Sequence, residues 1–144
     1  MAVAYDPQNI FAKILRGEIP AHKVYEDEVA LAIMDIMPRA EGHTLVIPKQ
    51  PARGLLDIEP ENLGRLIKRV QHVAKAVKTA FGADGLTLQQ FNESAGGQVI
   101  FHLHFHILPR WAGVALRPPG TMAENDGLRA RAEQIRAALG VFSE

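Results

Sequence analysis

The spacing of apolar residues predicts a chain built from one long helix and several short strands. Between Pro60 and Phe81, apolar side chains recur every three or four residues, which places them on one face of a helix. Other stretches are short, apolar or strictly alternating, and bounded by turn residues, as is typical of β-strands. The expected strands cover residues 22–26, 29–34, 42–49, 85–91 and 99–109.

Two shorter helices are expected nearer the ends of the chain. Apolar residues between positions 10 and 15 share one face, with Asp6 as the predicted cap and Gly17 as the predicted end. A last helix is expected to be capped by Asp126 and to end at Gly140. The sequence contains no internal repeat and no sign of a second domain.

Composition limits the size of the fold and the partners that it suits. The chain has 144 residues, of which 47% are hydrophobic, and this is enough to bury the core of one domain. We expect a single domain over residues 1–144, with its core over residues 6–110 and a C-terminal loop and helix over residues 111–144. Lys and Arg together number 16, as do Asp and Glu, so charge gives no reason to expect nucleic acid or a membrane as partner.

The cysteine count and the N-terminus narrow the picture further. The chain has no Cys, which excludes disulfides and thiolate metal sites. It shows no signal-peptide pattern and no apolar run of about 18 residues, so we expect a cytoplasmic location.

Three histidines carry the strongest chemical signal. His102, His104 and His106 alternate with Leu103 and Phe105, so an extended strand places the three imidazoles on one face. Imidazole can donate, accept or attack near neutral pH, and such a row indicates a site. Neighbouring imidazoles lie about 6.6 Å apart and the outer two about 13 Å apart, too far for one tetrahedral ion to collect all three without strain. We therefore expect no metal.

Each of the other candidate residues can have either a ligand-binding role or a purely structural one. Asp35 follows an expected strand, where it can bind the hydroxyls of a ligand or form a turn. His43 stands at the start of another strand, and taken alone it favours a structural role. The loop that carries Gly96 and Gly97 can bring backbone N–H groups close to an anion, or can be a plain turn. Its further hydrogen-bonding residues are Asn92, Ser94 and Gln98.

These motifs together resemble the histidine triad (HIT) family, and most closely its compact Hint-type and bacterial members. The triad and the apolar residues after it, at 102–108, form the most specific match. Weaker matching blocks follow the family order at residues 16–20, 35–38, 42–49 and 92–98. The resemblance implies an α+β fold with a five-stranded antiparallel sheet, one long helix and short terminal helices. It also implies a homodimer in which the two sheets join across the two-fold axis.

The resemblance implies chemistry at the α-phosphorus of a purine nucleotide, through a covalent nucleotidyl-histidine. His104 would be the nucleophile, and His102 would orient the cluster. His106 and His43 would contact phosphate oxygens or assist the leaving group. Hydrogen bonds from Asn92, Ser94 and Gly97 would stabilise the charged phosphoryl oxygens. No cofactor is implied.

The family pattern also implies how the nucleoside is held. Asp35 would bind the ribose hydroxyls. The nucleobase slot would be formed by Ile10, Phe11, Ile14, Ile33 and Ile36.

Two departures from the family pattern matter for the chemistry. Many bacterial members carry a zinc-binding Cys-x-x-Cys where this chain has Asn9 and Ala12, so no structural zinc is expected. Hint-type proteins commonly have a Ser where this chain has Val99, and its loss removes one hydroxyl near the leaving group.

Three functions follow as hypotheses. The first is hydrolysis of purine nucleoside phosphoramidates or acyl-nucleotides. The second is hydrolysis of dinucleoside polyphosphates. The third, from another class, is a nucleotide-binding regulatory module whose activity is incidental.

Overall fold

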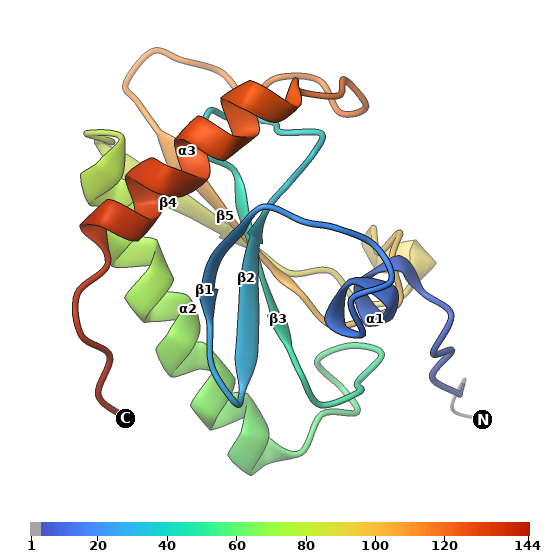
Figure 1. The fold of residues 1–144 in the computed structure, drawn as a ribbon. Helices are drawn as coiled ribbons and strands as arrows, with labels where there is room; N and C mark the ends of the chain where they lie inside the picture. Colours follow the sequence, from blue (N-terminus) through green and yellow to red (C-terminus); the bar gives the residue numbers. More distant parts are fainter. Residues whose placement is uncertain (1–3) are drawn as a thin grey trace.

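The computed structural model describes residues 4–144 and has an antiparallel sheet at its centre (Figure 1). The strands are β1 (Lys23–Glu26), β2 (Ala30–Met34), β3 (Thr44–Pro48), β4 (Gly85–Gln89) and β5 (Phe105–Arg110). They lie in the order β1-β2-β3-β5-β4, and each neighbouring pair is antiparallel. The helices of the described residues are α1 (Ile10–Leu15), α2 (Pro60–Ala80) and α3 (Asn125–Ala138), with a 3-10 turn at η1 (Ser94–Gly96). The expected fold of the single chain is confirmed, and the continuation of its sheet across a homodimer stays a prediction; residues 1–3 of the expected domain lie outside the described part.

The sheet separates two apolar cores because successive side chains of a strand point to opposite faces. Ala30, Ala32 and Met34 of β2 pack in the larger core with α2 and α3, whereas Leu31 and Ile33 face the smaller core with α1. The histidine segment follows the same rule, since its apolar members lie in the larger core. Those members are Leu103, Phe105 and Ile107. The alternating histidines are therefore directed to the face that carries α1.

The long helix α2 forms as its apolar spacing predicts. It begins at Pro60, whose missing N–H costs nothing in the first turn, and ends one residue before Phe81. Its apolar stripe packs on the sheet, with Leu66, Val70 and Val73 buried.

The core extends beyond residue 110, the limit expected from the sequence. In α3, Leu128, Ala132 and Ile135 are buried in the larger core beside α2. Burial of one large aliphatic side chain stabilises a fold by about 1.5–3 kcal/mol, so α3 is an integral part of the core.

The residues after α3 are also held against α2. Arg69 has 1% of its surface exposed, and it donates to Asp27 at 2.8 Å and to Glu144 at 2.7 Å. Its guanidinium lies 4.5 Å from the centre of the Phe142 ring. A charge buried to this degree is tolerated because carboxylates and an aromatic face surround it.

The strand that carries the histidines is shorter than expected. β5 begins at Phe105 rather than at Val99, so His102 and His104 precede it. The reason is that the Leu103 N–H donates to the carbonyl oxygen of Ala52 at 2.8 Å, in the loop after β3, instead of to a neighbouring strand.

The expected helix caps differ in detail. Asn9 caps α1, because its Oδ1 accepts from the Ala12 N–H at 2.9 Å, while Asp6 accepts from Gln8. Asp126 lies in the first turn of α3 and is not its cap. Gly17 ends α1 with a φ of 80°, as predicted.

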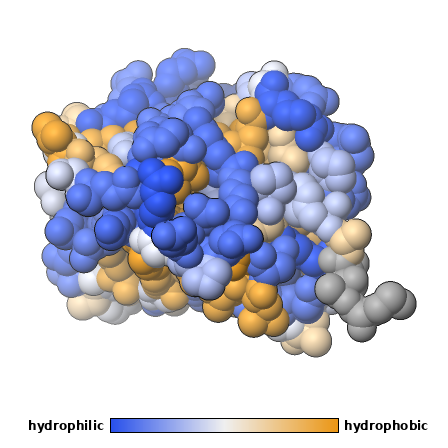
Figure 2. Space-filling model, turned by 90° about the horizontal axis from the view of Figure 1, so that it is seen from below, coloured by the Kyte–Doolittle hydropathy of each residue, from blue (hydrophilic) through white to orange (hydrophobic). Residues whose placement is uncertain are grey.

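The surface is mainly polar. Figure 2 shows one face covered largely by hydrophilic residues, with separate hydrophobic patches between them. Within residues 4–144, no helix is both long and apolar enough to cross a membrane.

Candidate active site

A cavity of about 490 Å³ lies between α1, the end of β2 and the histidine segment. Its wall is apolar along α1 and polar beyond the end of β2. The predicted site residues that line it are Ile10, Phe11, Ile14, Ile33, Asp35, Ile36, Gly97, His104 and His106. This volume is in the range of small-molecule sites, and one polar edge on an apolar slot is their usual composition.

His102 lies behind the cavity wall, with 1% of its surface exposed. Its Nε2 is 2.9 Å from the Pro48 carbonyl oxygen, which can only accept, so Nε2 carries the proton. In the neutral ring Nδ1 is then an acceptor, and the Tyr5 hydroxyl donates to it at 2.6 Å. Burial lowers the pKa of His102 and so favours this neutral form. Its partners therefore fix both the orientation and the tautomer of the ring.

His104 is oriented by the backbone of His102. Its Nδ1 lies 2.7 Å from the His102 carbonyl oxygen and therefore carries the proton, which leaves the lone pair on Nε2. The ring lines the cavity, and the Phe11 ring packs edge-on against it with 4.8 Å between centroids. Burial lowers the pKa of His104, so the ring is uncharged at neutral pH. A neutral, fixed imidazole with a free nitrogen has the properties of a nucleophile.

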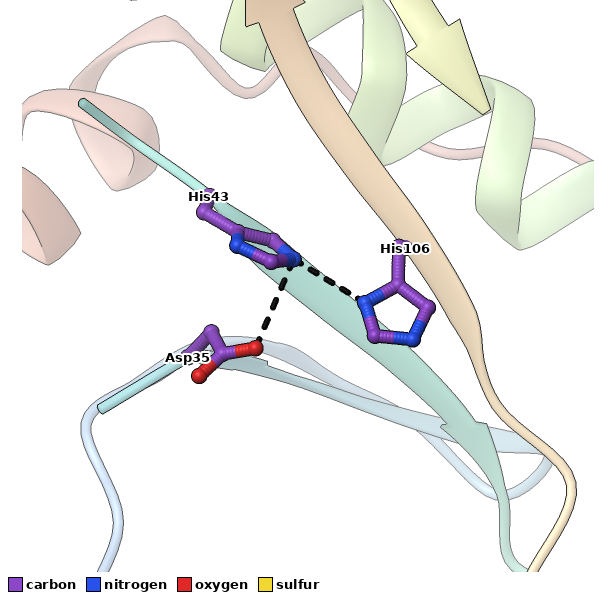
Figure 3. Close-up of side chains that lie close together, drawn as sticks. All are labelled: Asp35, His43 and His106. Atoms are coloured by element: carbon purple, nitrogen blue, oxygen red, sulfur yellow. Dashed lines mark hydrogen bonds and ion pairs between the residues drawn. The ribbon is translucent and has the colours of Figure 1, made fainter. Parts of the chain in front are cut away.

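His43 joins Asp35 to His106 (Figure 3). Its Nδ1 accepts from the Arg39 backbone N–H at 3.0 Å, so Nε2 carries the proton. That nitrogen lies 3.0 Å from His106 Nδ1 and 3.4 Å from Asp35 Oδ2. His106 Nδ1 is then the acceptor, and the proton of His106 lies on Nε2. The cluster therefore offers an N–H donor on a ring that lines the cavity.

Burial also sets the charge of this cluster. It lowers the pKa of His43 to about 3 and that of His106 to about 4, with smaller contributions from nearby histidines and from Arg39. Burial raises the pKa of Asp35, and a hydrogen bond from the Met37 N–H at 2.8 Å acts in the opposite direction. The imidazoles of the cluster are therefore uncharged at neutral pH.

The three residues of Figure 3 also have the composition of a metal site. Asp35, His43 and His106 bring three possible ligand atoms within 4.8 Å of one another. A metal would need the lone pair of His43 Nε2, but that atom carries the proton because Nδ1 accepts from Arg39. The arrangement fits hydrogen bonding better than metal binding.

A zinc site of the Cys-x-x-Cys kind does not fit this chain either. Asn9 is engaged in capping α1, and Ala12 offers no ligand atom. Both nitrogens of His102 already have protein partners, Tyr5 and Pro48. No nitrogen of this ring is left for a structural ion.

The loop before the histidines is held by its own polar residues. Gln98 donates to the carbonyl oxygens of Arg53 at 2.7 Å and Ile100 at 3.0 Å. Asn92 accepts from the Leu55 N–H at 2.8 Å. Neither side chain lines the cavity, and neither does the exposed Ser94. Their contact with a substrate stays a prediction, and the bonds shown here shape the loop.

The glycine of this loop that lines the cavity is Gly97. Its φ is 98°, and a Cβ there would lie 3.2 Å from the Phe91 ring, so a side chain would be strained. Its N–H donates to the Ser94 carbonyl oxygen at 3.0 Å, and that of Gly96 donates to Glu93. These N–H groups are engaged within the turn rather than directed to the cavity.

Two residues that hold the histidines of the site were not predicted. Tyr5 holds His102, and Arg39 both holds His43 and lines the cavity. Tyr5 is an isolated aromatic residue without a pattern. Arg39 lies between two segments that match the family pattern, residues 35–38 and 42–49. This position in the sequence is the signal that could have pointed to a role at the site.

Comparison with known proteins gives a consistent result. The HIT domain family model matches residues 16–113. The chain is 40% identical over 114 residues to adenylylsulfatase HINT3 of Arabidopsis thaliana, covering 75% of this chain but 58% of that protein. It is 44% identical over 104 residues to an uncharacterized HIT-like protein of Methanocaldococcus jannaschii, covering 72% of this chain and 80% of that protein.

Solved structures agree with the sequence comparison. A HIT-like protein involved in cell-cycle regulation from Bartonella henselae superposes with a TM-score of 0.92 at 55% identity, covering 95% of this chain and 100% of that one. A histidine triad nucleotide-binding protein from Sulfolobus tokodaii superposes with a TM-score of 0.83 at 38% identity, covering 89% of each chain.

Proposed function

Because the chain belongs to the HIT domain family, we propose that it hydrolyses purine nucleotides at the α-phosphorus through a covalent intermediate on His104. One observation carries the proposal: His104 is a neutral imidazole in the cavity wall whose Nδ1–H is fixed by a carbonyl, so that Nε2 is free to attack.

The proposed reaction has two displacements. His104 Nε2 forms a bond to the α-phosphorus, and the bond from phosphorus to the leaving group breaks with its electron pair going to that group. Water then attacks the same phosphorus, the bond between phosphorus and His104 Nε2 breaks, and the nucleoside monophosphate is released. The net reaction consumes one water, whose hydroxyl goes to phosphorus and whose proton goes to the leaving group or to solvent.

The cavity wall offers groups for the phosphate. His106 presents its Nε2–H, as the acceptor role of its Nδ1 requires. Val99 also lines the cavity, and its backbone N–H has no hydrogen-bond partner among residues 4–144. We assign both donors to the non-bridging phosphoryl oxygens, where negative charge develops during attack.

The nucleoside would occupy the apolar part of the cavity. Phe11 and Ile33 belong to this wall, and their side chains suit a flat purine ring. Asp35 lies between this wall and the histidines, with Oδ1 bonded to the Met37 N–H, and we assign it to the ribose hydroxyls.

The proposed active form is a homodimer joined through β4. This strand is at the edge of the sheet, so one side of its backbone is unpaired within the described chain. Leu86 and Leu88 on it are 37% and 50% exposed, and Ile67 of α2 beside them is 41% exposed. Pairing two such edges would extend the sheet and cover this apolar strip, here called the β4 strip.

The proposed substrates differ only in the leaving group. The candidates are phosphoramidates and acyl-nucleotides, with dinucleoside polyphosphates as the alternative. The name of the Arabidopsis relative adds adenylyl sulfate, and Val99 in place of a hydroxyl residue is the observation that favours it over amine-releasing substrates. A regulatory module that binds nucleotides is the competing class, and a cytoplasmic location stays a prediction.

Turnover of the His104→Ala variant tests the proposal. We expect formation of adenosine monophosphate to fall by about a thousandfold or more with every substrate, because the nucleophile is lost. Affinity for adenosine monophosphate should stay within about tenfold, since His104 supplies no more than one ordinary contact in the ground state. His22→Ala, away from the cavity, is the matched control. Undiminished turnover by the His104 variant would reject the mechanism, and tight binding with no turnover by the wild type would favour the regulatory module.

A further inference from the structure

Arg39 stands in the wall between two cavities. It lines the large cavity together with His104 and His106. It also lines a second cavity of about 120 Å³, whose other basic residues are Arg110 and Arg117. Arg39 therefore borders both cavities.

Three hydrogen bonds hold Arg39 in place. Its backbone N–H donates to His43 Nδ1 at 3.0 Å, and its carbonyl oxygen accepts from the Arg117 N–H at 2.7 Å. Its side-chain Nε donates to the Arg117 carbonyl oxygen at 3.0 Å. The guanidinium is thus oriented through Nε, while its two terminal nitrogens have no hydrogen-bond partner among residues 4–144.

Arg39 also lacks a counter-ion. No carboxylate of residues 4–144 lies within 4.0 Å of its guanidinium, whereas neighbouring Arg117 and Arg131 both pair with Glu41. An oriented guanidinium with free terminal donors is the usual means of binding an oxyanion such as a carboxylate, sulfate or phosphate.

Arg39 lies beyond His106 as seen from the nucleophile. It bonds to His43, whose Nε2 is 3.0 Å from His106 Nδ1, and it lines the second cavity with Arg110 at the end of β5, whereas His104 precedes the start of that strand. In a displacement at phosphorus, the attacking and leaving atoms are roughly in line, so the leaving group departs on the side opposite His104.

The protonation state of His106 also favours a leaving group that needs no proton. An amine leaving group must take up a proton as the P–N bond breaks, but burial lowers the pKa of His106 to about 4 and keeps the ring neutral. Val99 supplies no hydroxyl to pass a proton. A sulfate, carboxylate or phosphate anion of low basicity leaves with the electron pair of the P–O bond and needs no proton.

We propose that Arg39 binds the leaving group, and that the preferred substrates are nucleotides whose leaving group departs as an oxyanion rather than as an amine. This inference rests on the proposed function and specifies its substrate class. The P–O bond from the α-phosphorus to the bridging oxygen breaks, the oxyanion is released against the Arg39 guanidinium, and water later frees the nucleoside monophosphate from His104.

The test compares two substrates that share adenosine monophosphate and differ in the leaving group. Adenosine 5′-phosphosulfate releases sulfate, and adenosine 5′-phosphoramidate releases ammonia. For Arg39→Gln we expect kcat/KM with the phosphosulfate to fall by about tenfold to a hundredfold, the loss of a hydrogen bond to a charged group. With the phosphoramidate we expect a clearly smaller loss, because its leaving group carries no negative charge for the guanidinium to bind. Arg39→Lys should recover part of the loss because the charge is kept.

The matched control removes an arginine charge elsewhere. Arg129 is exposed on α3 and pairs with Asp126, so Arg129→Gln should leave both substrates unchanged. Equal losses with both substrates would show that the Arg39 side chain supports the site as a whole rather than the leaving group, and would overturn the inference. So would a wild-type enzyme that prefers the phosphoramidate. Failure of the proposed function looks different, since then the wild type turns over neither substrate or the His104→Ala variant stays active.

Discussion

At the scale of single residues, the site is a set of imidazoles whose protons are placed by their partners. Pro48 and Tyr5 fix His102, the His102 carbonyl fixes His104, and the Arg39 N–H fixes His43. The Pro48 and His102 carbonyl oxygens can only accept and the Arg39 N–H can only donate, so these three atoms fix the tautomers; the Tyr5 hydroxyl then donates to the ring nitrogen of His102 that has no proton. A buried ring with fixed protons is ready for attack without reorganisation.

Tyr5 gives the sharpest prediction at this scale. Tyr5→Phe removes the hydroxyl that donates to the neutral form of His102 but keeps the aromatic ring packed 5.6 Å from it. We expect kcat to fall by about tenfold with KM nearly unchanged, as for other residues that orient an active group. The pKa of His102 should rise because its neutral form loses a hydrogen bond, and the acid limb of the rate profile should move to higher pH.

Steady-state kinetics from pH 4 to 8 measures both effects. Phe91→Leu is unsuitable as a control because Phe91 lines the cavity, whereas Tyr25→Phe changes a tyrosine on β1 away from it. An unchanged pH profile and an unchanged kcat in Tyr5→Phe would contradict the positioning role.

At the scale of elements, the alternation of side chains correctly predicted which residues of the histidine segment face the core, but it did not predict where β5 begins. Leu103, Phe105 and Ile107 are buried in the larger core, as the pattern predicted. The start of the strand depends on the bond from the Leu103 N–H to Ala52, and local sequence contains no signal of that contact. The same limit explains Tyr5, whose partner is distant in the chain.

The polar loop shows what sequence reasoning leaves open. Asn92 and Gln98 are predicted to contact the substrate, which stays a prediction, and the structure adds bonds from these side chains to Leu55, Arg53 and Ile100. The residue types that suit phosphate binding are also those that satisfy a turn. Only the three-dimensional arrangement separates the two uses.

The edge strand β4 carries the prediction at this scale. Leu88→Asp places a charge in the β4 strip, where Leu88 is 50% exposed in the single chain. We expect the protein to pass from dimer to monomer at micromolar concentration, because an interface that buries a carboxylate without a partner is strongly destabilised. Light scattering after size-exclusion chromatography measures the mass.

The control for this prediction is a leucine outside the strip. Leu56 is 85% exposed in the loop before α2, so Leu56→Asp should leave the mass unchanged. A wild-type protein that is monomeric, or a Leu88→Asp variant that stays dimeric, would rule out assembly through β4.

At the scale of the whole molecule, the C-terminal helix and the residues after it complete the core. The sequence predicted α3, but its packing beside α2 and the burial of Arg69 against Glu144 depend on contacts between distant segments. Apolar residues that recur every three or four positions identify a helix in the sequence. Which element packs against its apolar face is known only once the fold is known.

Global stability should depend on pH through the buried histidines. His43 and His106 have pKa values of about 3 and 4 in the folded protein, below the usual 6.5 of an unfolded chain. Between pH 4 and 6.5 the unfolded chain therefore binds more protons than the folded protein. The contribution of these histidines to the free energy of unfolding is fully present above pH 6.5 and is lost as the pH falls toward 4. From pH 7 to 5 the expected loss is about 2 kcal/mol for each of these histidines.

Urea unfolding at pH 7 and pH 5 measures this loss. In His106→Asn the difference between the two pH values should shrink by about 2 kcal/mol, because one titrating group is removed. A variant with the same pH dependence as the wild type would mean that His106 is not held neutral by the fold.

The proposed mechanism requires that His104 carries the nucleotide during turnover. The direct measurement is mass spectrometry of enzyme mixed with adenosine 5′-phosphosulfate and quenched within one turnover at alkaline pH, where a phosphorus–nitrogen bond survives. We expect an adenylyl group on the peptide that contains residues 102–106, located on His104 and absent from His104→Ala. Turnover without any adduct, or an adduct on another histidine, would contradict it.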